Sequence, residues 1–387
     1  MVLTTRRTEP VTILQRERSL RPDLFLVLPY LALAALGIVM VYTASAPRNE
    51  LLGIDPGATV RRHIIFVIVG FGVFIASSLI GGRTLRSLSI PFYTGAAIAL
   101  ALVLTPLGKE TKGAQRWIEL GPLQLQPSEF AKIAVILALA VLLANAGSSL
   151  KWNHIAGAVL LVGVPAVLIF RQPDLGTMLV FAFVSVVMLF VGGTTLRQLA
   201  FIALAATVMA VALFQVGAIK TYQIDRVTSF LDGGGDQENA DYNQLQSQIA
   251  IGSGGFFGKG LLAEDATQTN LSFVPEQSSD FIFTAVGEQL GFVGGSIVLG
   301  LYAMIVWRLL IAAANGRDRF SQMVAIGIAA LLVFHVFVNV GMTLRMIPVT
   351  GLPLPFLSAG GTFFIAMSLG LGVAHSVWMR RSPVPDE

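Results

Sequence analysis

The order of apolar and polar residues along this 387-residue chain is dominated by apolar runs of about 20 residues, which recur from one end to the other. At 1.5 Å per residue, a helix of that length crosses the ~30 Å hydrocarbon core of a bilayer. Because lipid offers no hydrogen-bond partners, such runs are expected to be helices. The pattern predicts about ten spans, near residues 24–45, 63–80, 90–107, 129–146, 153–170, 176–193, 197–215, 281–307, 321–342 and 361–379.

The predicted fold class is an all-α integral membrane protein with one polytopic domain at residues 24–380, between tails at residues 1–23 and 381–387. The connection between the seventh and eighth spans, residues 216–280, is far longer than the others, polar and glycine-rich. Loops of this length are usually functional or disordered. Within it, residues 244–262 predict a short amphipathic helix followed by a glycine-rich turn.

The composition of the chain limits the classes of protein and of functional site that it can form. Charged residues make up 12% of the chain and hydrophobic residues 55%, whereas soluble domains carry roughly 25% charged residues. The absence of cysteine excludes disulfides, thiolate metal sites and thiol nucleophiles. The four histidines lie far apart, without metal-ligand spacing. The basic residues are scattered between the spans, which is typical of membrane flanks and does not indicate nucleic-acid binding.

Five arginines precede the first span (Arg6, Arg7, Arg16, Arg18 and Arg21). Positive flanks stay in the cytoplasm, so the N-terminus is predicted to be cytoplasmic. An even number of spans then returns the C-terminus to the same side. In this orientation only six of the 22 acidic residues face the cytoplasm. Most of the acidic residues and the long loop are therefore predicted to lie on the extracytoplasmic face, and so is any site that they form.

Asp280 stands where the long loop enters the eighth span, in the segment Pro275-Glu-Gln-Ser-Ser-Asp280. If Pro275 begins a helix, Glu276 and Asp280 lie on one face, at i and i+4. Two carboxylates that close do not both ionise easily, so one pKa is expected to rise towards that of a general base. The alternative is an acidic helix start favoured by the helix dipole.

Other outer-face residues are candidates for binding a substrate. Glu129 and Lys132 open the fourth span after a predicted N-cap at Ser128, either as functional charges or as a structural ion pair. Asp174 lies in the turn between the fifth and sixth spans, where it could simply cap the sixth helix. The remaining candidates are Trp117, in an expected amphipathic stretch, and three cations that could meet phosphate, Arg226, Lys259 and Arg345.

Residues 348–361 contain three prolines and three glycines, so they cannot form regular helix. Irregular backbone at membrane depth is tolerated only where it is buried or lines a cavity. This indicates a re-entrant loop bordering a site, with Ser358 near its tip. Glu288, about two turns inside the eighth span, is an intramembrane carboxylate whose partner the sequence does not identify.

Five segments, in order along nearly the whole chain, resemble the SEDS family (shape, elongation, division and sporulation proteins). They are Trp117-Ile-Glu-Leu-Gly121 with Gln126-Pro-Ser-Glu-Phe-Ala-Lys132, Gln172-Pro-Asp-Leu-Gly-Thr177, Gln246-Ser-Gln-Ile-Ala-Ile-Gly-Ser-Gly-Gly255, the Pro275 to Asp280 block with Phe281-Ile-Phe283, and the loop from Pro348 to Gly361. The amino-acid sequence of that loop resembles the RodA-like elongation members of the family more than the division members. Ala359 departs from the family, which more often has tyrosine there.

The resemblance implies a peptidoglycan glycosyltransferase that joins lipid II units by β-1,4 bonds and releases undecaprenyl pyrophosphate. It implies that Asp280 is the base, that Lys132, Arg226, Arg345 or a divalent ion (Mg or Mn) counters the pyrophosphate charge, and that Glu129 orients Lys132. It also implies a bacterial cytoplasmic-membrane location, the elongation machinery, and a class B penicillin-binding protein on the eighth and ninth spans and the outer loops. A lipid II flippase, an ion-coupled transporter and a scaffold for that partner are the alternatives; the first two need hydrated paths or inverted repeats that the sequence does not display.

Overall fold

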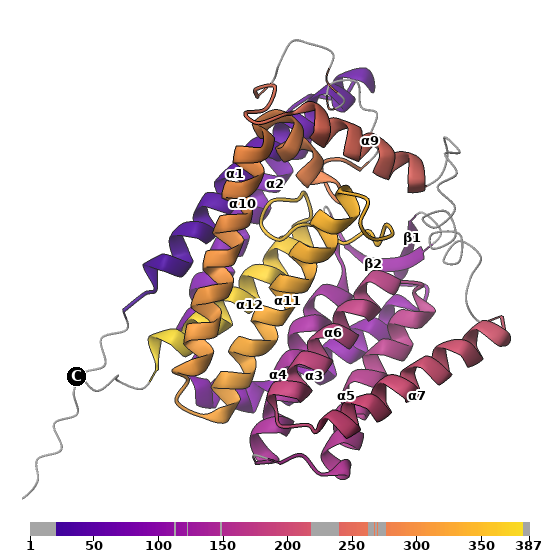
Figure 1. Cartoon of the computed structure of the whole chain (residues 1–387), viewed down its shortest axis with the longest axis vertical. Coiled ribbons are helices and arrows are strands. Elements are labelled where there is room, and N and C mark those ends of the chain that lie inside the picture. The colour runs from indigo at the N-terminus through magenta and orange to yellow at the C-terminus, as the bar shows by residue number, and fades with distance from the viewer. Residues whose placement is uncertain are drawn as a thin grey trace, which may run out of the picture.

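The computed structural model of the chain describes residues 21–111, 114–121, 123–147, 149–217, 240–261, 267, 269 and 276–381. Its helices form one bundle, with a small sheet and a short helix at one end (Figure 1). Nine described helices are long and apolar enough to cross a membrane, and the 17-residue α6 is a shorter apolar helix between them. These ten are α1 (Leu24–Leu51), α2 (Ala58–Leu79), α3 (Gly82–Val103), α4 (Pro127–Asn145), α5 (Trp152–Arg171), α6 (Leu175–Val191), α7 (Leu196–Gln215), α10 (Ile282–Ala314), α11 (Arg319–Thr343) and α12 (Gly361–Met379).

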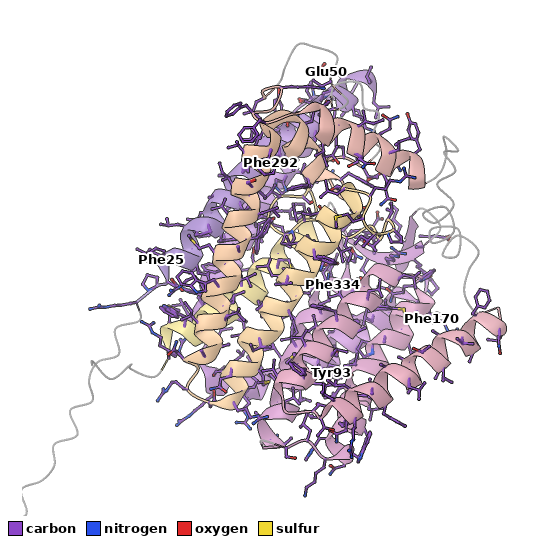
Figure 2. The ribbon with its side chains drawn as sticks, viewed as in Figure 1. Phe25, Glu50, Tyr93, Phe170, Phe292 and Phe334 are labelled. Carbon is purple, nitrogen blue, oxygen red and sulfur yellow. The ribbon has the colours of Figure 1, made fainter. Side chains whose placement is uncertain are left out.

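Each helix overlaps one predicted span, so the prediction of a helical membrane protein is confirmed. Helices α4, α11 and α12 are largely buried and form the centre of the bundle. By contrast, α7 has a single buried residue, Gln198, and projects from the bundle (Figure 1). Large apolar side chains such as Phe25 and Phe292 are exposed on the outer surface of the helices (Figure 2). Such surfaces suit contact with lipid.

The beginning of α1 and the end of α12 lie at the same end of the bundle (Figure 1). The backbone N–H of Asp23 donates to Nε2 of His375 at 2.9 Å, and the Asp23 carboxylate pairs with Arg308 of α10 at 2.8 Å. The described chain therefore enters and leaves the bundle on one side, as an even number of spans predicts.

The segment around Trp117, predicted as an amphipathic stretch, forms strands. It forms an antiparallel sheet of β1 (Gly108–Thr111), β2 (Ala114–Leu120) and β3 (Leu123–Leu125), in the order β1-β2-β3. Trp117 pairs with Lys109 across the first two strands. Alternating residues in Arg116-Trp-Ile-Glu-Leu120 fit a strand with two dissimilar faces.

The predicted short helix in the long loop is present as α9 (Ala240–Ser253), followed by turns. These turns pack against a break in α10 at Gly291, whose φ of +64° lies in the left-handed region that favours glycine. There the N–H groups of Lys259 and Gly260 donate to the carbonyls of Glu288 and Gln289, each at 3.0 Å. The glycine-rich turn thus replaces hydrogen bonds that the broken helix gives up.

Candidate functional site

Asp280 lies in a turn at the outer end of α10, and not inside a regular helix. Residues 276–281 form this turn, and α10 begins at Ile282. The Asp280 N–H donates to the Glu276 carbonyl at 3.1 Å, as in one helical turn, but Glu276 has a φ of +57°. This left-handed residue prevents the helix from continuing backwards. The expected i, i+4 stacking of the two carboxylates on a helix face is therefore corrected, while the place of Asp280 at the loop–span junction is confirmed.

The loop between α11 and α12 is irregular, as predicted, and it packs against Asp280. Gly351 has a φ of +72°, and a β carbon added to it would lie 3.4 Å from Oδ2 of Asp280. Asn339 of α11 uses its amide to hold both segments, donating to the Asp280 carbonyl at 2.7 Å and to the Leu352 carbonyl at 2.8 Å. The carboxylate of Asp280 therefore sits beside a backbone that only glycine follows without strain.

Ser358 has an internal role in this loop. It is buried, and its Oγ accepts a hydrogen bond from the Leu354 N–H at 2.9 Å, which closes a turn. The next residue, Ala359, donates its backbone N–H to the Ser278 carbonyl at 2.8 Å. Ser358 thus shapes the loop that supports the Asp280 turn, and its role in binding substrate stays a prediction.

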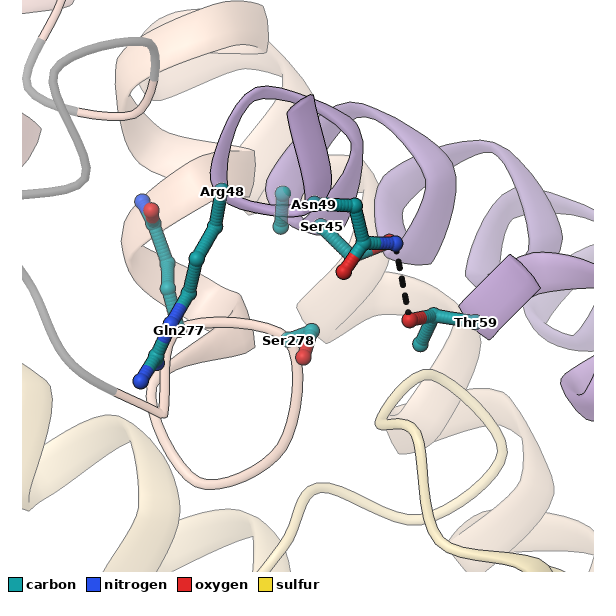
Figure 3. Close-up of a pocket in the computed structure, with 7 residues that line it drawn as sticks. Ser45, Arg48, Asn49, Thr59, Gln277 and Ser278 are labelled. Atoms are coloured by element: carbon teal, nitrogen blue, oxygen red, sulfur yellow. Dashed lines mark hydrogen bonds between the residues drawn. The ribbon is translucent and has the colours of Figure 1, made fainter. Parts of the chain in front are cut away.

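A small polar pocket opens beside the same turn (Figure 3). It is lined by Ala44, Ser45, Arg48 and Asn49 of α1, by Thr59 of α2, and by Gln277 and Ser278 of the turn. Asn49 donates to Thr59 at 3.1 Å and so ties the outer ends of the two helices together. Arg48 is exposed, and within the described part of the chain it forms no ion pair. The pocket therefore carries a positive charge, and its lining residue Ser278 comes two positions before Asp280 in the chain.

Sequence reasoning treated Arg48 only as a membrane flank. The missed signal is its place in the last turn of α1, on the predicted outer side, where positive flanks are less common. Another exposed arginine, Arg61, is engaged by Asp55 at 2.9 Å. The Arg61 hydrogen bond lowers the pKa of the Asp55 carboxyl. Arg61 is thus a useful contrast to Arg48.

Glu129 and Lys132 pair as the spacing predicts, with 2.8 Å between Oε2 and Nζ, and both side chains are buried. The lysine ammonium also lies 3.2 Å from Nε2 of His335 and 5.3 Å from the centre of the Phe363 ring. With 1% of its side chain exposed, Lys132 is enclosed between α4, α11 and α12. The ammonium does not face the outer surface, so the geometry favours the structural ion pair over direct contact with phosphate.

The N-cap predicted at Ser128 is shifted by two residues. Gln126 occupies the N-cap position of α4, and Pro127 is the first helical residue. Proline suits that position because it has no N–H to satisfy and its φ is already helical. Ser128 is therefore inside the first turn and buried.

Asp174 caps α6, the simpler of its two predicted roles. Its carboxylate accepts from the Thr177 N–H at 3.2 Å and from the Thr177 hydroxyl at 3.0 Å. Arg116 of β2 approaches it at 3.9 Å and donates to the Gln172 carbonyl at 3.0 Å. Asp174 also helps to position a basic group, Arg116, which joins the sheet to the turn before α6.

Glu288 finds its partner in Lys259. The two side chains meet at 3.0 Å, and the fully buried carboxylate also accepts from the Thr269 N–H at 3.0 Å and from the Thr269 hydroxyl at 2.6 Å. Gln277 donates to the same hydroxyl at 2.9 Å and lines the pocket. Lys259 is thus committed to anchoring the long loop to α10, a contact that the geometry favours over its predicted role at phosphate.

The remaining predicted residues are dispersed. Arg345 follows α11 with a φ of +58°. Trp117 is half-buried in β2, and Arg226 lies outside the described residues. Among those that are described, no three His, Asp or Glu side chains gather as a metal site. The divalent ion and the phosphate roles of Arg226 and Arg345 stay predictions.

Comparisons with known proteins identify a family model, a curated relative and solved structures that are similar to this chain. A family model described as cell cycle protein, for FtsW, RodA and SpoVE, matches residues 24–382. Peptidoglycan glycosyltransferase MrdB of Escherichia coli is 34% identical over 362 residues, which is 94% of each chain. The crystal structure of the Thermus thermophilus rod shape determining protein RodA matches with a TM-score of 0.69 and 31% identity, over 95% of this chain and 99% of that one. A chain from a peptidoglycan synthase complex, described as coordinating polymerization and crosslinking, matches with a TM-score of 0.74 and 32% identity, over 92% of this chain and 97% of that one.

Proposed function

The chain belongs to the FtsW, RodA and SpoVE family of cell cycle proteins, and we propose that it is a peptidoglycan glycosyltransferase of cell elongation. Its substrate is lipid II, which it polymerises into β-1,4 glycan at the outer face of the bacterial cytoplasmic membrane. Both termini are then cytoplasmic, because the beginning of α1 and the end of α12 share one end of the bundle, opposite the Asp280 turn. The observation that carries the proposal is the turn that contains Asp280, whose residues Gln277 and Ser278 line a polar pocket with an exposed arginine.

The proposed chemistry needs one base and one site for a leaving diphosphate. Asp280 takes the proton from the 4-hydroxyl of the acceptor sugar, and that oxygen attacks the anomeric carbon of the donor. The new glycosidic bond forms as the bond from that carbon to the diphosphate breaks, so an α-linked donor gives a β-linked product. Undecaprenyl pyrophosphate leaves with the electron pair, and a positive charge in the pocket stabilises it.

Arg48 is the described residue best placed to supply that charge. Lys132 and Lys259 each bind a buried carboxylate inside the protein, whereas Arg48 is exposed in the pocket wall. A guanidinium binds phosphate oxygens through a planar fork of N–H donors. Arg226 and Arg345 remain further candidates for the same diphosphate.

The proposed partner is a class B penicillin-binding protein that contacts α10, α11 and the outer loops. Support comes from a related chain solved in a peptidoglycan synthase complex and from exposed apolar side chains on both helices, including Phe292 and Phe337. These side chains suit either lipid or a transmembrane helix.

The experiment that tests the function is polymerisation of purified lipid II by the wild-type protein, co-purified with a penicillin-binding partner whose transpeptidase is inactivated. Glycan chains that a muramidase digests are the expected product. The same preparation in liposomes would be assayed for movement of lipid II between leaflets. Movement without polymerisation would favour the flippase, and polymer formation in the absence of the purified chain would remove the assignment altogether.

Replacing Arg48 with glutamine is expected to lower polymerisation about 10²-fold, as removal of one stabilising donor does in other enzymes. Arg61→Gln is the matched control, since Arg61 is also exposed but bonded to Asp55, and it should retain activity within about twofold. Steady-state rates with lipid II measure both. Equal losses in the two variants would contradict a specific role for Arg48.

A further inference from the structure

His335 lies in the middle of α11, is fully buried, and touches two segments that bear on the site. Its Nε2 is 3.2 Å from the ammonium of Lys132, and its Nδ1 is 3.3 Å from the carbonyl oxygen of Pro353 in the irregular loop. Its ring also packs on Phe363, with centroids 5.0 Å apart. The imidazole is therefore the link between the buried charge pair on α4 and the loop beside Asp280.

These partners define which ring nitrogen carries the hydrogen. The Pro353 carbonyl only accepts, so Nδ1 must be the donor. Lys132 forms an ion pair with Glu129 at 2.8 Å, and an ammonium only donates, so Nε2 must accept. His335 is thus neutral and held in its Nδ1–H form, because each of its two contacts requires the same form.

The loop that His335 holds continues directly to the candidate base. One turn further along α11, Asn339 binds the preceding carbonyl, that of Leu352, and also the Asp280 carbonyl. Between these anchors and the Asp280 turn stands Gly351, against the carboxylate. Two successive loop carbonyls are therefore fixed from one face of α11, and the carboxylate rests on the backbone that they fix.

We propose that His335 is a positioning residue for the polymerisation reaction. Lys132 orients the imidazole, and the imidazole fixes the Pro353 carbonyl. The loop backbone thereby keeps its position against the Asp280 carboxylate. His335 does not touch substrate. The inference rests on the proposed function, since it concerns the placement of the proposed base. Misplacement of a reacting group by about 1 Å can cost about 10²-fold in rate, so a small shift of this loop is enough to affect turnover.

Three substitutions separate the two contacts. In His335→Asn, the amide nitrogen replaces Nδ1 and can still donate to Pro353, but the side chain does not reach Lys132. In His335→Gln, the amide oxygen replaces Nε2 and can accept from Lys132, while the donor to Pro353 is lost. His335→Phe keeps an aromatic ring against Phe363 and loses both contacts, and so controls for packing.

The experiment measures kcat and KM for lipid II, the melting temperature, and hydrogen exchange of residues 350–359, all with the intact complex. His335→Phe and His335→Gln are expected to lower kcat about 10- to 100-fold, to leave KM within about twofold, and to speed exchange in the loop. His335→Asn is expected to restore kcat to within about fivefold of wild type and to restore slow exchange.

Four results would overturn the inference: full activity in all three variants, rescue by glutamine but not by asparagine, a rise in KM with kcat unchanged, or activity losses that follow the melting temperature in every variant. A wild-type complex that makes no glycan is a different outcome, because it refutes the proposed function itself.

Discussion

Replacing Asp280 with asparagine is expected to reduce the kcat of lipid II polymerisation by about 10²- to 10⁴-fold, the usual contribution of a general base. Asparagine has nearly the same shape but cannot take a proton from the acceptor hydroxyl at neutral pH. Two contacts that hold the turn are made by the Asp280 backbone, to Glu276 and Asn339, and asparagine keeps both. The variant should therefore fold normally and bind lipid II with a KM close to that of the wild type.

The controls for this experiment are two other carboxylates. Glu119→Gln changes an exposed acid on β2 that pairs with Lys109, and it should retain activity. Glu276→Gln changes the acid nearest in sequence, whose carboxylate contacts the Ser279 hydroxyl at 3.3 Å. A smaller loss is expected there, because this contact turns Glu276 towards its own turn. If Glu276→Gln inactivates the enzyme and Asp280→Asn does not, the base has been assigned to the wrong carboxylate.

The membrane spans could be predicted from sequence because lipid imposes one local rule, that each apolar segment must satisfy its own backbone. This rule needs no knowledge of the neighbours, and all ten helices follow it. The Glu129–Lys132 pair was predictable for a similar reason, since spacing within one helix fixes which side chains meet. Gly351 and its loop were recognisable as irregular from their prolines and glycines alone.

The features that the sequence did not predict depend on contacts between distant segments. The partner of Glu288 is Lys259, in a turn that a broken α10 accommodates, and no local pattern joins them. Lys132 is enclosed because α11 and α12 cover it. Arg48 resembles any flanking arginine until the Gln277–Ser278 turn is placed beside it. The prediction that Glu276 and Asp280 share one helix face is wrong because the Glu276 backbone adopts a left-handed conformation. The residue type does not reveal this conformation.

Replacing Lys132 with methionine is expected to destabilise the protein by about 3–5 kcal/mol, because it leaves the buried Glu129 carboxylate without its cation. Methionine fills similar space, so little of the loss should come from packing. Lys109→Met is the matched control: its pair with Glu119 is about half-exposed, at 49% and 46%, and such pairs contribute roughly 0–1 kcal/mol. The unfolding free energy of both variants would be compared with wild type in the same detergent.

The double variant Glu129→Gln/Lys132→Met separates the cost of a stranded charge from any benefit of the pair. Removing both charges together should recover most of the stability. The attraction within a buried ion pair is largely offset by the cost of desolvating its two charges. It should not recover polymerisation, because His335 then has no ammonium to hold Nε2 as the acceptor. A double variant as unstable as Lys132→Met would mean that the pair itself stabilises the bundle. A double variant with wild-type activity would show that the loop keeps its place beside Asp280 without this buried pair.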